Sequence, residues 1–81
     1  MTTNREKLKD LLMDIFVLIE PEFRWDLRRE DVMTWDSLGT VSMAVGVQET
    51  FGPHFTPDEA LSIQGFQDIV RILEQKGVSF E

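Results

Sequence analysis

The chain has 81 residues, of which 42% are hydrophobic and 28% are charged, so we expect a single domain over residues 1–81. It contains no cysteine and one histidine, which excludes disulfides, a thiolate nucleophile and every cysteine-based zinc site. Fifteen acids against eight bases give a net charge of −7, which disfavours nucleic acid and anionic membranes and favours partners with basic surfaces.

No apolar run approaches the roughly 20 residues that a membrane span requires. The first residues, Met1 to Lys7, mix charges of both signs and lack the apolar core of a signal peptide. We therefore expect a cytoplasmic protein that binds no membrane.

The first predicted element is an amphipathic helix over residues 4–20, with Thr3 as its N-cap. Apolar residues recur at helical spacing: Leu8, Leu11, Leu12, Ile15, Phe16 and Ile19. Pro21 is expected to end the helix, because the residue before a proline is pushed towards extended geometry.

Residues 21–35 have no sustained helical period. Alternation of apolar and charged residues over 23–27 could suggest a strand, but the sequence offers it no partner strand. We predict a long loop instead. Its apolar residues would pin it to the core: Phe23, Trp25, Leu27, Val32 and Trp35.

A second helix is predicted over residues 37–51, with Asp36 as N-cap and Gly52-Pro53 as its stop. Gly46 lies inside it at a cost of about 1 kcal/mol relative to alanine, which indicates a close packing contact.

The rest of the chain predicts two further helices. Thr56 and Pro57 are typical of an N-cap and first helical position, and they predict a short helix over 57–62. The last helix is expected over 66–76, with Gly77 as its stop. The predicted fold class is thus all-α: a small bundle of three main helices and one short helix, with a long first loop.

Ser37 is the candidate functional residue. It falls in the first turn of the second helix, where backbone N–H groups lack intrahelical partners and the helix dipole favours an attached or bound phosphate. By position alone, Ser37 is most simply an ordinary residue of a helix start, since serine is common there.

The sequence around Ser37 resembles the acyl carrier protein family. The motif Asp36-Ser37-Leu38 opens a helix that ends in Gln48-Glu49-Thr50-Phe51-Gly52. Two later segments, residues 55–60 and 63–70, resemble the family's entries to its third and last helices. The resemblance covers nearly the whole chain and implies the family's bundle, with 4′-phosphopantetheine carried on Ser37 as the attachment point of a non-catalytic carrier.

The same resemblance implies roles for neighbouring residues. Asp36 would cap the helix and contribute to the encounter with a phosphopantetheinyl transferase. Leu38, Val41 and Val45 could form an apolar patch that partners grip, although some of them could belong to the core. Glu49 matches an acidic recognition position.

The chain departs from fatty-acid carriers at four positions. Ser42, Gln48 and Gly39 stand where those carriers commonly have acids, and Trp35 replaces a small residue before the motif. These departures favour a discrete carrier of a specialised pathway. Implied partners are the transferase, an acyl- or aminoacyl-loading ligase, and acyl-processing enzymes with basic docking surfaces, and we expect a monomer. We also expect the acyl group to enter the bundle partly, between the second helix and the short third one.

Two other functions stay open. An aminoacyl or peptidyl carrier would share the arm but differ in cargo. An unmodified acidic helical adaptor would bind basic proteins. A hydrolase is disfavoured, because Ser37 lies in no Gly-x-Ser-x-Gly elbow and His54 fits a solvated loop residue. The bases Arg24, Arg28 and Arg29 are too sparse for nucleic acid, and no EF-hand spacing predicts a metal site.

Overall fold

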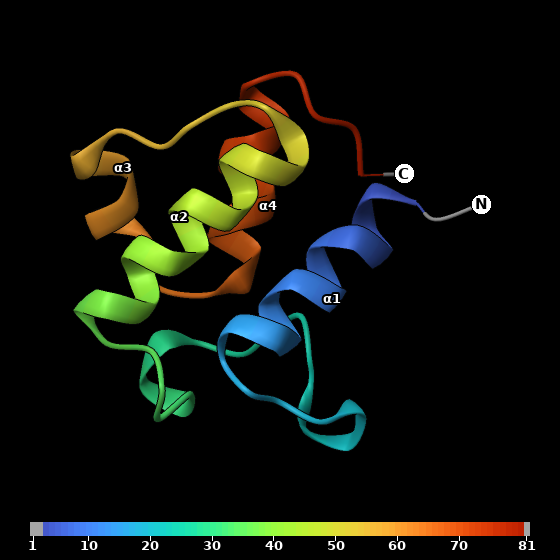
Figure 1. Cartoon of the computed structure of the whole chain (residues 1–81), viewed down its shortest axis with the longest axis vertical. Helices are drawn as coiled ribbons and strands as arrows, with labels where there is room; N and C mark the ends of the chain where they lie inside the picture. Colours follow the sequence, from blue (N-terminus) through green and yellow to red (C-terminus); the bar gives the residue numbers. More distant parts are fainter. Residues whose placement is uncertain (1–2, 81) are drawn as a thin grey trace.

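The chain folds as a bundle of helices, seen in a computed structural model that describes residues 3–80 (Figure 1). The elements in order are α1 (Asn4–Ile15), the 3-10 turns η1 (Glu20–Glu22) and η2 (Arg29–Asp31), α2 (Ser37–Phe51), α3 (Pro57–Ser62) and α4 (Phe66–Gln75). Residues 3–80 contain no β-strand, so the predicted all-α class is confirmed. None of the helices in this range has the length and apolar character needed to cross a membrane.

Helix α1 ends at Ile15, five residues earlier than predicted. The Leu18 N–H donates to the Met13 carbonyl at 2.9 Å, and Val17 adopts a positive φ of 55°. This arrangement is a Schellman stop, which normally uses glycine because a β-branched residue is strained in left-handed geometry. The prediction was wrong because valine is not a typical residue for such a stop and because the helical spacing of apolar residues continues beyond Ile15. Pro21 instead occupies the first turn of η1.

The predicted long loop between α1 and α2 is confirmed, and its apolar residues hold it to the bundle. Leu27, Val32 and Trp35 are buried, while Phe23 and Trp25 are partly buried against the core. The loop also forms one backbone bridge that the sequence did not predict.

This bridge is antiparallel and joins Arg28 to Gly65, just before α4. The Arg29 N–H donates to the Gln64 carbonyl at 2.7 Å, and the Phe66 N–H donates to the Leu27 carbonyl at 3.1 Å. The alternating segment therefore finds a partner in the chain that connects α3 to α4, and the loop is fixed beside these helices.

The capping residues set the bounds of the other helices. The Asp36 carboxylate accepts from the Gly39 N–H at 2.8 Å, and Gly52 ends α2 with φ of 101°. At α3, the Thr56 hydroxyl and the Glu59 carboxylate form a reciprocal capping box. Helices α2 and α3 have the predicted bounds, and α4 ends one residue before the predicted position, with Lys76 as its C-cap.

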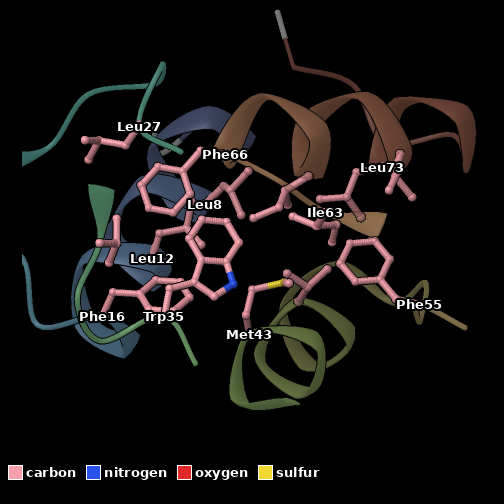
Figure 2. Packing of buried hydrophobic residues seen from close by; sticks show 14 of the residues in the cluster. Leu8, Leu12, Phe16, Leu27, Trp35, Met43, Phe55, Ile63, Phe66 and Leu73 are labelled. Carbon is pink, nitrogen blue, oxygen red and sulfur yellow. The ribbon is translucent and has the colours of Figure 1, made fainter. Parts of the chain in front are cut away.

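An aromatic cluster lies at the centre of the core (Figure 2). Phe16 comes from the end of α1, Trp35 from the loop and Phe66 from the start of α4. The ring centroids of Phe16 and Trp35 are 5.0 Å apart, and those of Trp35 and Phe66 are 5.3 Å apart. Such aromatic pairs add about 0.5–1.5 kcal/mol each beyond their burial. The residue before Asp36 is thus anchored in the core.

Candidate functional site

Ser37 is the first residue of α2, and its side chain is exposed. Within residues 3–80, the N–H groups of Ser37 and Leu38 have no hydrogen-bond acceptor. An anion attached to the Ser37 hydroxyl would meet these donors and the positive end of the helix dipole. The exposed Ser37 and two unpaired backbone N–H groups thus belong to the same first turn of α2.

A network of hydrogen bonds fixes the turn that presents Ser37. The Thr40 hydroxyl donates to the Asp36 carbonyl at 3.0 Å and accepts from the Trp35 indole N–H at 3.1 Å. The Thr34 hydroxyl donates to the Phe16 carbonyl at 2.8 Å. Because Trp35 is packed in the aromatic core, Ser37 is exposed on a rigid support.

The structure explains the glycine at position 39. A Cβ added there would lie 2.8 Å from the Thr34 carbonyl oxygen and 3.0 Å from the Phe16 ring. The backbone cannot yield easily, because Thr34 is tied to Phe16. The absence of an acid at this position therefore follows from close packing under the turn.

The three apolar candidates on α2 are on the surface. Leu38 is 74% exposed, Val41 59% and Val45 50%. Glu49 is also exposed, as are Ser42 and Gln48. The alternative that some of these three residues belong to the core is therefore wrong, and their role in gripping partners stays a prediction.

Hollows between α2 and α3 adjoin this patch. One has a volume of about 260 Å³ and is lined by Arg29, Ser37, Val41 and Leu61, among others. The other has a volume of about 330 Å³ and extends past Ala44 and Val45 to His54 and Phe55. Both hollows are lined by Thr40, Val41, Pro57 and Ala60. We call the two together the α2–α3 groove.

Helix α3 forms the more exposed wall of the groove. None of its six residues is buried. Its start is held by the capping box, and Glu59 forms an ion pair with Lys76 at 3.0 Å. The hydrogen bond from the Thr56 backbone N–H, and then the bond to Lys76, lower the pKa of Glu59.

Other candidates stay apart from Ser37 or form no site. His54 is exposed, as predicted, and lies in the part of the groove lined by Val45 and Gln48. No group of three or more potential metal ligands is found in the described part of the chain. Arg29 is the residue that sequence reasoning missed, because only the bridge to Gly65 brings it to the groove.

Two curated proteins match the chain over most of its length. It is 29% identical over 69 residues to the acyl carrier protein of Coprothermobacter proteolyticus, covering 85% of this chain and 84% of the relative. It is 28% identical over 71 residues to the acyl carrier protein of Solidesulfovibrio magneticus, covering 88% of this chain and 91% of the relative. No family model matches the chain, and no solved structure matches it significantly. The chain therefore has distant curated relatives of that name.

Proposed function

We propose that this chain is a non-catalytic carrier protein with 4′-phosphopantetheine attached to Ser37. The observation that carries the proposal is the exposed Ser37 hydroxyl at the start of α2, on a turn fixed by Trp35 and Thr40. The name of the two curated relatives supports the same function.

The residues present fit this group. Ser37 supplies the hydroxyl that would form the phosphodiester, and the unpaired N–H groups of Ser37 and Leu38 would donate to the phosphate. The bound arm supplies a thiol that carries acyl groups as thioesters. This chemistry suits a chain without cysteine, since the reactive sulfur is imported.

Asp36 has a positioning role in the proposal. Its carboxylate is the N-cap of α2, through the bond from Gly39, and so fixes the direction in which Ser37 points. Leu38, Val41 and Val45 would form the apolar centre of a docking surface, with Glu49 at its acidic edge. Such a surface fits a transferase, a loading ligase and acyl-processing enzymes that present basic residues around an apolar contact.

The α2–α3 groove would shelter part of the acyl group. Val41 and Ala60 line both of its hollows, and the first hollow is also lined by Ser37. Because α3 has no buried residue, it is the helix that can move with the least loss of packing.

Modification by a broad-specificity transferase tests the proposal. With coenzyme A present, we expect the intact mass to rise by one phosphopantetheine. The Ser37→Ala variant should show no rise, whereas Ser42→Ala, which changes an exposed serine of the same helix, should be modified like the parent chain. An unchanged mass with several active transferases would contradict the carrier role and favour the acidic adaptor.

A second measurement addresses the cargo. Purified synthetases and ligases, each with a panel of fatty, carboxylated and amino acids, would be offered the modified protein. Loading of an amino acid alone would assign an aminoacyl carrier, and loading of other acids an acyl carrier. The specialised pathway, the monomeric state and the cytoplasmic location remain predictions from the sequence.

A further inference from the structure

We infer that Arg29 is an anion-binding residue of the α2–α3 groove and that it pairs with the phosphate of the arm on Ser37. The inference rests on the proposed function and adds a positioning residue to it. Arg29 and Ser37 line the same hollow of about 260 Å³.

The backbone around Arg29 is fixed. Its N–H donates to the Gln64 carbonyl at 2.7 Å, next to the bridge between Arg28 and Gly65. Since Gln64 follows α3 closely, this hydrogen bond holds the Arg29 backbone next to α3, and Arg29 and Leu61 line the same hollow. The position of Arg29 is set by tertiary structure, and its side chain is half-buried.

Arg29 has no carboxylate partner within residues 3–80, although acids flank it. Glu30 pairs with the Arg28 guanidinium at 3.3 Å, and Asp31 accepts from the Arg28 backbone N–H at 3.1 Å. Both neighbouring acids are thus directed to Arg28. The Arg29 guanidinium keeps its charge available to a group in the groove.

Apart from Ser37, the other residues that line the hollow have no free polar side-chain group that would compete with an anion for the Arg29 guanidinium. The Thr40 hydroxyl is already bonded to the Asp36 carbonyl and the Trp35 indole. Val41, Pro57 and Leu61 are apolar. A phosphate on Ser37 would also lie near the Asp36 carboxylate, and the positive charge of Arg29 offsets this repulsion. Guanidinium groups bind phosphate oxygens in a bidentate manner.

The expected consequence of this pairing is that the phosphopantetheine arm has a preferred direction. With its phosphate held by Arg29, the arm would leave Ser37 along the groove, between Val41 and Leu61, and not straight into solvent. The acyl group would then begin at the mouth of the groove. Arg29 therefore acts on the arm's direction, and it has no part in the modification chemistry.

Nuclear magnetic resonance of the modified protein tests the pairing directly. We expect the Arg29 side-chain Nε–H resonance to shift between the unmodified and the modified parent chain. Arg29→Gln should shift the phosphorus resonance and remove the contacts between the arm and Val41 or Leu61. Arg24→Gln is the matched control, because it removes an exposed arginine of the same loop that does not line this hollow and leaves the Arg28–Glu30 pair intact, so it should leave both unchanged.

An unchanged phosphorus resonance and unchanged arm contacts in Arg29→Gln would overturn the inference while leaving the carrier role intact. So would an Arg29 signal that responds only when a carboxylated acyl group is loaded.

A second test needs no transferase. Ser37→Glu places a carboxylate at the same end of the hollow, and its coupling to Arg29→Gln is read from a double-mutant cycle in urea. We expect Arg29→Gln to reduce the folding equilibrium constant about two- to five-fold more in the Ser37→Glu background than in the parent chain, the range of a partly exposed ion pair. The excess should shrink in 1 M salt.

The cycle separates the two proposals. Arg24→Gln in the same cycle should show no excess, because Arg24 does not line this hollow. Equal coupling for the two arginines would overturn the inference. Coupling to Arg29 alone, in a chain that no transferase modifies, would support the anion site and reject the carrier function.

Discussion

The two sides of α2 differ sharply in packing. Towards α1, Met43 and Val47 are fully buried, and a Cβ added at Gly46 would lie 2.8 Å from a Leu11 methyl group. Towards α3, Val41 and Val45 stay largely exposed beside an open groove. Figure 1 shows α2 between these neighbours. One helix thus serves as a wall of the core on one side and as a binding surface on the other.

The largest change in stability is expected from substitutions on the buried side of α2. Met43→Ala is expected to cost about 2–5 kcal/mol of unfolding free energy, because it leaves a cavity in the core. Val41→Ala should cost less than about 1 kcal/mol, as typical of a surface position. Urea denaturation of both variants measures the difference.

If Met43→Ala fails to fold, Met43→Leu can be measured in its place. This change conserves volume and should cost under about 1.5 kcal/mol of unfolding free energy. Equal costs for Met43→Ala and Val41→Ala would mean that the groove side is as closely packed as the core.

Gly46 gives an intermediate effect. Gly46→Val is expected to cost about 1–3 kcal/mol, because its Cβ would meet Leu11 and Ile15. Ser42→Val introduces the same side chain at an exposed position of α2 and should be nearly neutral, since serine and valine have similar helix propensities. Thermal unfolding of the pair is the measurement. A neutral Gly46→Val would show that the Leu11 and Ile15 side chains can move aside at little cost.

The smallest expected effect is a pH-dependent change in the amide protection of α3. Glu59 has a lowered pKa in the folded chain, so its contribution is complete above the unfolded pKa and is lost as pH falls through the lowered folded value. Amide protection of α3 should therefore decrease on acidification in the parent chain. Glu59→Ala should show low α3 protection at neutral pH and no such acid step.

Asp58→Ala removes the neighbouring acid, which has no part in the capping box, and should retain the acid step. Protection of α3 equal to that of α1 in Glu59→Ala would contradict the view of α3 as the movable wall of the groove.

The sequence predicted those features that depend on local chemistry. Asp36, Gly52 and the Thr56-Pro57 pair are strong helix signals, and the bounds of α2 and α3 followed from them. The exposed place of Ser37 at a helix start followed from the same cap. Gly46 was correctly expected at a close contact, because a glycine inside a helix is costly without one.

The features that were missed depend on contacts between distant residues. The end of α1 rests on a left-handed Val17, a conformation that the residue type disfavours. The bridge between Arg28 and Gly65 pairs the loop with a segment that is not itself a strand, so no strand pattern in the sequence predicts it. In the sequence, Arg29 is one of three sparse loop arginines with no assigned role, since its place in the groove depends on that bridge.

The two tryptophan side chains lie in different environments, which can be used in fluorescence measurements. Trp35 is buried and hydrogen-bonded to Thr40 beneath the turn of Ser37, whereas Trp25 is half-buried under the Arg5 guanidinium, 5.1 Å from its ring. Replacing Trp25 by phenylalanine would leave one emitting side chain, two residues from the serine. Fluorescence from that single indole could then follow events at position 37 in real time, without any attached dye.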